Sequence, residues 1–262
     1  MDRRLLLILA LTRLALFPLL AAPPATPGPL RVGMELAYPP FEMADTEGKP
    51  AGVSVDLAEA LGKHLHRPVE IQNLPFDGLI PSLKTGRIEV IISSMTATPE
   101  RAHAVTFSDP YLTTGLCLLV AKKSPIQSIS DIDQKNRTVA VKQGTTGHLF
   151  TRNFKHAHVL VLDRESACVL EVIQSKADAF IYDQLSILKH AGQNPESTRA
   201  LLQPFQVESW AIAMRKGNEP LQKDVNAFLR EFRASGGFER LGERWLQEPK
   251  KAFLRLGVPF VF

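Results

Sequence analysis

The sequence predicts an α/β protein of two lobes joined by a hinge. Two stretches of the chain each alternate short apolar strands with amphipathic helices, which is typical of parallel sheets covered by helices. Two long extended runs, residues 115–121 and 206–215, are predicted to cross between the two lobes. Helices near the C-terminus then close the fold. The cleft between lobes of this kind is a natural place for a small ligand.

The first half of the chain alternates strand and helix from residue 30 onward. Ser54 is expected to cap the first helix, Pro68 to end it, and Gly86 to end the second. Two prolines exclude helix at residues 35–42, so we expect a loop there that holds Tyr38. Strands are predicted at residues 30–34, 69–71 and 88–92, and helices at residues 54–67, at 76–84 and from 99 onward.

Residues 88–101 carry the chemistry expected at the edge of a parallel sheet, where open α/β sheets bind ligands. Thr98 is a good N-cap for the helix that follows the strand. Between them lie small hydroxyl residues, which are Ser93, Ser94 and Thr96. Arg101, one turn into the helix, supplies a guanidinium that suits a carboxylate. The alternative is a surface arginine paired with Glu100 or with solvent.

The second half repeats the alternation after a lysine-rich break at residues 122–125. A loop is expected at residues 107–111, before the first crossing strand. Strands are predicted at residues 138–141, 159–162 and 178–182, and helices at residues 147–155, 165–175 and from 183 onward. Residues 219–247 are expected to form two helices broken at the glycine pair 236–237.

The chain divides into four expected segments. Residues 1–25 resemble an export signal, with Arg3 and Arg4 before a run rich in leucine and alanine. Arg13 interrupts that run, so an uncleaved membrane anchor is the alternative. The remaining segments are lobe 1 at residues 30–120 plus 212–250, lobe 2 at residues 121–211, and a tail without a clear role at residues 251–262.

Composition excludes several classes of function. Hydrophobic residues make up 45% of the chain and charged residues 22%, as in ordinary globular proteins, and the net charge of +4 is scattered. Nucleic acid is therefore not an expected partner. The two cysteines, Cys117 and Cys168, are expected to be buried free thiols, with a disulfide as the alternative. The sequence shows no metal-ligand set and no nucleophile-elbow pattern, so we expect no metal, cofactor or catalytic group.

Several ordered blocks give the chain a close resemblance to the bacterial family-3 extracellular solute-binding proteins, the polar amino-acid receptors of ABC importers. The blocks are residues 37–42 (AYPPFE), 52–57 (GVSVDL), 79–84 (LIPSLK), 92–101 (ISSMTATPER), 107–111 (FSDPY), 143–146 (QGTT) and 178–183 (DAFIYD). The resemblance spans residues 30–247. It implies a type II periplasmic-binding-protein fold with a two-strand hinge, and a periplasmic monomer that hands a free amino acid to an inner-membrane permease.

The resemblance also implies a site for the backbone end of an amino acid. Arg101 matches the position that clamps the ligand α-carboxylate, helped by backbone N–H groups at Thr96 and Thr146. Asp183 matches the partner of the α-ammonium, together with the Ser94 carbonyl and the Thr96 hydroxyl. A buried zwitterion needs both of its charges paired, and these two residues provide one opposite charge from each lobe.

Further matches concern the ligand side chain. Tyr38 and Phe76 match aromatic walls, and Glu35 and Ser93 lie where the family contacts the tip of the side chain. A carboxylate at this end favours arginine, lysine or ornithine as the ligand. The alternative is that Glu35 bonds its own loop, which would leave a pocket for glutamine or another neutral amino acid. Gly147 departs from relatives that carry a polar side chain at this position.

Structural roles are the alternative for several of these residues. Asp183 is a good helix N-cap. Thr145 and Thr146 stand before a helix and offer a ligand free N–H groups at the positive end of the helix dipole, and the alternative there is an ordinary capped helix start. Tyr38 and Phe76 would serve equally as core aromatics. A second kind of function is an enzyme on the same fold, resembling the cyclohexadienyl dehydratases, but the intact Arg101 and Asp183 favour amino-acid capture over catalysis.

Overall fold

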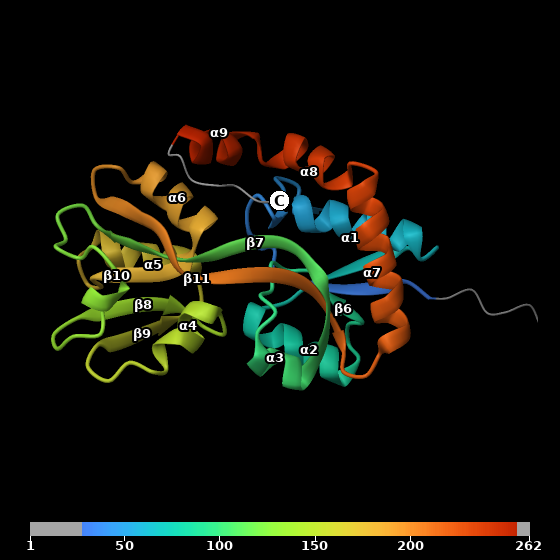
Figure 1. Ribbon diagram of the computed structural model, residues 1–262, viewed down its shortest axis with the longest axis horizontal. Coiled ribbons are helices and arrows are strands. Elements are labelled where there is room, and N and C mark those ends of the chain that lie inside the picture. The colour runs from blue at the N-terminus through green and yellow to red at the C-terminus, as the bar shows by residue number, and fades with distance from the viewer. Residues whose placement is uncertain (1–27, 256–262) are drawn as a thin grey trace, which may run out of the picture.

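The computed structural model describes residues 28–255. Its main sheet has eight strands in the spatial order β5-β1-β6-β11-β7-β10-β8-β9, so the two halves of the chain occupy opposite ends of one sheet. Helices flank each end, and β7 and β11 run from one end to the other (Figure 1). The predicted two-lobed α/β fold is confirmed.

The first lobe is built on a parallel core. The strand β1 (Leu30–Met34) lies between β5 (Val69–Asn73) and β6 (Val90–Ile91) and is parallel to both. Its helices are α1 (Val53–His64), α2 (Leu79–Thr85) after a 3₁₀ turn at Phe76–Gly78, and α3 (Pro99–Ala104). Thr98 caps α3 and a left-handed Gly86 ends α2, both as predicted.

Two local predictions in this lobe are wrong. The expected loop at residues 35–42 contributes to a small antiparallel sheet, whose strands are β2 (Ala37–Tyr38), β3 (Glu42–Ala44) and β4 (Pro50–Ala51). The N-cap of α1 is Gly52 rather than Ser54, because the backbone there has φ 120° and passes close to the Phe41 carbonyl oxygen. Ser54 is buried, and its hydroxyl donates to Glu42 at 2.6 Å.

The second lobe repeats the parallel arrangement. The strand β8 (Thr138–Lys142) lies between β9 (His158–Leu162) and β10 (Ala179–Asp183). Its helices are α4 (Thr146–Thr151), α5 (Glu165–Ile173) and α6 (Gln184–Gln193). The helix α4 stops short of the predicted residue 155, because the backbone N–H groups of residues 155–157 donate instead to the Asp133 carboxylate.

The crossing strands are longer than predicted. The strand β7 (Val105–Ala121) includes residues 107–111, where we expected a loop, and pairs antiparallel with β11 (Thr198–Arg215). Pro110 is accommodated where the register of the pair shifts, close to Ala211. Residues 116–120 of β7 also pair with β10, which favours a lobe boundary in the middle of β7. The predicted lobe boundaries at residues 120 and 211 stay a prediction.

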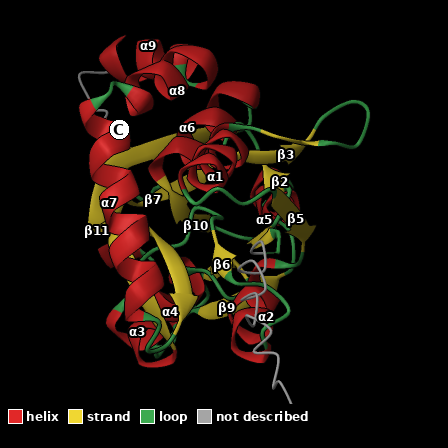
Figure 2. Cartoon of the chain, turned by 90° about the vertical axis from the view of Figure 1, so that its right-hand side faces the viewer, coloured by secondary structure: helices red, strands yellow, loops and turns green. Residues whose placement is uncertain are grey.

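The C-terminal helices follow β11, and the first two of them pack on the first lobe. They are α7 (Glu219–Ala234), α8 (Gly237–Trp245) and α9 (Gln247–Arg255), and the break at Gly236 has the left-handed backbone that glycine favours. The helix α7 packs along β7 and β11, while α8 packs on α1 (Figure 2). The side chains of Arg244 and Trp245 both donate to Asp56 in α1.

The predicted tail at residues 251–262 is wrong in its first part. Residues 251–255 belong to α9, and the Phe253 side chain is buried, since an apolar ring there gains more from packing than from solvent exposure. The rest of that segment and the predicted export signal at residues 1–25 lie outside the described residues. Within residues 28–255, no helix is both long and apolar enough to cross a membrane.

Both cysteines behave as predicted. Cys117 in β7 and Cys168 in α5 are buried free thiols in one hydrophobic cluster of the second lobe. Burial raises the pKa of each thiol to about 12, so neither thiol is ionised at neutral pH.

Candidate ligand-binding site

A cavity lies where the carboxyl ends of strands from both lobes meet the crossing strands. We call it the inner cavity. The polar residues of the cavity meet there because they stand at the carboxyl ends of strands. Glu35 follows β1, Ser94 follows β6, Thr145 follows β8 and Asp183 ends β10. Nine of the ten predicted site residues line it, and these are Glu35, Tyr38, Phe76, Ser94, Thr96, Arg101, Thr145, Thr146 and Asp183.

The tenth predicted residue, Ser93, lies directly behind the cavity wall. Its hydroxyl oxygen accepts a bond from the Glu35 backbone N–H at 3.0 Å and donates to Glu42 at 3.3 Å. Ser93 thus supports two cavity-lining residues and is itself buried.

Arg101 is buried at the cavity rather than exposed on the surface of its helix. Its guanidinium donates to the Thr96 carbonyl at 2.8 Å and, across the lobes, to the Gly144 carbonyl at 2.9 Å. Burial lowers the pKa of Arg101 to about 10, which leaves the group charged at neutral pH. These backbone carbonyls are uncharged, and the nearby Glu208 carboxylate favours the charged form of Arg101, so the cavity holds a fixed positive charge.

Asp183 combines the two roles considered for it. It caps α6, with its Oδ1 accepting from the Ser186 N–H at 3.1 Å, and it lines the cavity. The Tyr38 hydroxyl donates to the same Oδ1 at 2.6 Å and so bridges the two lobes. Burial raises the pKa of Asp183 to about 7, against the opposing effect of the Tyr38 hydrogen bond.

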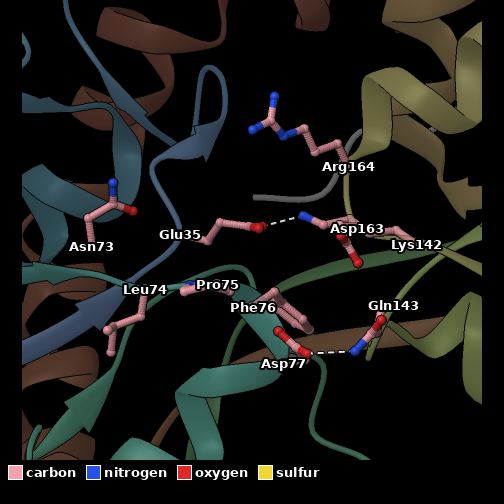
Figure 3. A pocket seen from close by; sticks show the side chains of 10 residues that line it. All are labelled: Glu35, Asn73, Leu74, Pro75, Phe76, Asp77, Lys142, Gln143, Asp163 and Arg164. Carbon is pink, nitrogen blue, oxygen red and sulfur yellow. Dashed lines mark hydrogen bonds and ion pairs between the residues drawn. The ribbon is translucent and has the colours of Figure 1, made fainter.

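Glu35 has a partner that the sequence did not indicate. Its carboxylate forms an ion pair with Lys142, the last residue of β8 in the opposite lobe, as Figure 3 shows. The Lys142 side chain is only 4% exposed and that of Glu35 is 16% exposed. Glu35 is therefore neither a free carboxylate facing the cavity nor a residue that bonds only its own loop.

Aromatic rings form one wall of the inner cavity. Tyr38 stacks on Phe41 with ring centres 5.5 Å apart, and meets the rings of Tyr182 and Trp210 edge to face. Phe76 also lines the cavity, and its ring centre is 5.4 Å from the Arg101 guanidinium carbon. Both aromatic residues singled out in the sequence thus contact the cavity, and Tyr38 also belongs to the core.

Two buried carboxylates at the cavity were missed. Glu42 accepts hydroxyl bonds from Ser54 and Ser94, and Glu208 on β11 accepts one from Thr96 at 3.1 Å. Burial raises the pKa of both, to about 8 for Glu42. A carboxylate inside an extended run, two residues before Trp210, was the available indication for Glu208.

At the start of α4 in the second lobe, one polar group already bonds the protein's own backbone. The Thr145 hydroxyl donates to the Lys142 carbonyl at 2.7 Å, so it turns toward its own backbone. Gly147 leaves no room for a side chain, because a Cβ there would lie 2.7 Å from the Ile181 carbonyl oxygen. Among the described residues, no group of three or more His, Cys, Asp or Glu side chains is placed to hold a metal ion.

Two lobes around a cavity that carries opposite charges from each side define a solute-binding protein of the type II periplasmic class. Residues 30–248 match the family of bacterial extracellular solute-binding proteins, family 3. The chain belongs to this family, as the sequence predicted.

Curated relatives are named for amino acids. The chain is 31% identical over 219 residues to the L-cystine-binding protein TcyJ of Escherichia coli, covering 83% of this chain and 82% of the relative. It is 31% identical over 230 residues to the L-arginine-binding protein of Pseudomonas aeruginosa, covering 83% and 87%. These names confirm the prediction of a binding protein rather than an enzyme.

Solved structures agree with the fold. An ancestral arginine-binding protein bound to arginine is 35% identical, with a TM-score of 0.78, and the match covers 84% of this chain and 99% of that one. An ancestral amino acid-binding protein described as a precursor of cyclohexadienyl dehydratase is 34% identical, with a TM-score of 0.76, covering 84% and 96%.

Proposed function

We propose that this protein binds a free polar L-amino acid between its lobes in the periplasm, as a monomer, and delivers it to an ABC-transporter permease. The observation that carries the proposal is the pair of opposite charges at the inner cavity, Arg101 from the first lobe and Asp183 from the second. Several curated relatives named as amino-acid-binding proteins of ABC transporters support it.

The charges fit an amino acid for an electrostatic reason. A carboxylate leaving water needs a cation and hydrogen-bond donors, which Arg101 supplies, while the ammonium needs the Asp183 carboxylate. Because the two residues belong to different lobes, the ligand interacts with both only when the lobes are closed. Differential affinity of this kind shifts a hinge toward its closed state.

The ion pair of Glu35 with Lys142 bears on the choice of ligand side chain. The cationic ligands predicted from the sequence would have to compete with Lys142 for the Glu35 carboxylate. Similar solved proteins are described as bound to arginine, to glutamine and to lysine. The proposed function therefore names polar amino acids as the class, which a thermal-shift screen of the free amino acids would narrow.

The proposal is tested by replacing the carboxylate anchor. Arg101→Ala should weaken binding of whichever amino acid the screen selects by roughly 3–5 kcal/mol, because the ligand carboxylate would be buried without a cation. Calorimetry of the purified variant measures this loss. Arg230→Ala is the matched control, since that side chain is 66% exposed and, within residues 28–255, forms an ion pair only with Asp109, at 3.6 Å. Near-wild-type affinity of Arg101→Ala, or no stabilisation by any amino acid, would contradict the proposed function.

A further inference from the structure

A second and larger cavity adjoins the inner one, and we call it the outer chamber. Its volume is about 540 Å³, against about 40 Å³ for the inner cavity. Figure 3 shows the residues that line it, which are Glu35, Asn73, Leu74, Pro75, Phe76, Asp77, Lys142, Gln143, Asp163 and Arg164. Glu35 and Phe76 line both cavities, so a ligand held in the inner cavity has room to extend into the outer chamber.

Each cavity holds a cation and a carboxylate that come from opposite lobes, besides further carboxylates at Glu42 and Glu208 in the inner cavity and at Asp77 and Asp163 in the outer chamber. The opposite-lobe pair of the inner cavity is Arg101 with Asp183, and that of the outer chamber is Lys142 with Glu35. The cations lie near one ring, with the Arg101 guanidinium carbon 5.4 Å and the Lys142 Nζ 5.7 Å from the centre of Phe76. A ligand that reaches both cations therefore needs to extend only past one phenyl ring.

The ion pair of Glu35 with Lys142 favours some ligand side chains over others. A lone cation could pair with Glu35 but would separate Lys142, which is buried, from its only charged partner among the described residues. A stranded buried charge costs several kcal/mol. A neutral amide gains no charge interaction with the pair. An end that carries both an ammonium and a carboxylate satisfies Glu35 and Lys142 together.

We infer that the ligand has a second amino-acid head at the far end of its side chain, which Glu35 and Lys142 bind. The chemical class is a diaminodicarboxylic acid, with one head at Arg101 and Asp183 and the other in the outer chamber. Arg164 and Asp163 at the exposed part of the chamber add one charge of each sign near that second head. The inference rests on the proposed function, because the first head must occupy the inner cavity.

The experiment compares ligands by calorimetry on the purified protein. L-Cystathionine and L-cystine carry two heads, L-methionine lacks the second, and L-arginine, L-lysine and L-glutamine have cationic or neutral ends. A two-headed ligand should bind at least about tenfold more tightly than each of the others, which corresponds to about 1.4 kcal/mol. Tighter binding of arginine, lysine or glutamine would overturn the inference.

Substitutions at Lys142 and Glu35 test whether these two residues bind the second head of the ligand. Lys142→Met should weaken L-cystathionine binding about tenfold or more, whereas the control Lys123→Met, at an exposed lysine, should leave it unchanged. The double variant Glu35→Gln with Lys142→Met removes the pair without stranding a charge, and should bind two-headed ligands no better than L-methionine. If the double variant still bound two-headed ligands more tightly than L-methionine, as the wild type is expected to, the inference would be overturned.

The two proposals fail differently. If an amino acid binds and its affinity depends on Arg101 while two-headed ligands show no advantage, only the outer-chamber inference is wrong. If no ligand depends on Arg101, the proposed function itself is wrong.

Discussion

Four carboxylates lie at the inner cavity, and their surroundings give them different properties. Glu35 has a charged partner in Lys142, whereas the donors that bond Glu42, Asp183 and Glu208 in the described part of the chain are neutral. Burial raises the pKa of these last three, to about 8 for Glu42 and about 7 for Asp183. Each therefore lowers stability when it is ionised, and each favours a nearby positive charge such as a ligand ammonium.

The raised pKa values predict how stability depends on pH. The native Glu42 carboxyl holds its proton up to about pH 8, while the unfolded chain loses it near the ordinary value of 4.5. Between these values the native state binds more protons, so its stability falls as pH rises, and below pH 4.5 the penalty is absent. Asp183 and Glu208 act in the same direction, and Glu165, whose pKa is lowered, acts in the opposite one.

The substitution Glu42→Gln tests the predicted direction of the change in stability with pH. The variant should gain stability over the wild type by a few kcal/mol at pH 8.5 and show little difference at pH 4.5, since glutamine has no charge to bury. Urea unfolding at a series of pH values measures the difference. Glu47→Gln is the control, because the Glu47 side chain is 68% exposed. Equal effects of Glu42→Gln at both pH values would contradict the predicted cause.

Among the elements, α4 packs very close to a strand of the second lobe. Gly147 in its first turn lies against β10, where an added Cβ would come 2.7 Å from the Ile181 carbonyl oxygen and 3.0 Å from that residue's side chain. The absence of a side chain lets α4 begin directly beside the sheet. Its N-terminal residues, Thr145 and Thr146, consequently reach the inner cavity.

Gly147→Ala should therefore destabilise the protein by about 1–3 kcal/mol, because backbone has to move to make room. Gly192→Ala in α6 is the matched control, since nothing lies within 4 Å of its added Cβ. That substitution should instead stabilise the helix by about 0.5–1 kcal/mol. Chemical denaturation measures both, and a loss of the same size at the two positions would show that packing against β10 is not the cause.

At the scale of the whole molecule, contacts between the lobes differ in burial. Tyr38 with Asp183 and Glu35 with Lys142 are buried or nearly so. Glu100 pairs with Arg152 at 2.8 Å on the surface, where both side chains are more than half exposed. Exposed ion pairs contribute little, whereas a buried hydrogen bond to a charged group contributes about 1.5–3 kcal/mol. The buried contacts should therefore dominate the hinge equilibrium.

Tyr38→Phe removes the hydroxyl bond to Asp183 and leaves the ring in place. The ligand-free variant should populate the open state roughly tenfold more than the wild type, in line with that bond energy. Small-angle scattering would show this as a larger radius of gyration. Arg152→Gln, which breaks the surface pair, should scatter like the wild type. Identical scattering from Tyr38→Phe and the wild type would contradict a role for this contact in closure.

The sequence by itself determined the order along the chain of the strands in the main sheet and of helices α1 to α8, the caps at Thr98 and Gly86, and most of the residues that meet at the inner cavity. These features are local or lie at the carboxyl ends of strands, where hydrophobic periodicity and cap chemistry are sufficient. Only the tertiary structure decided that Glu35 pairs with Lys142, 107 residues away, and that Glu42 and Glu208 lie buried at the cavity. Such contacts depend on how segments far apart in the chain meet in space, and local sequence patterns do not predict which distant residues come together.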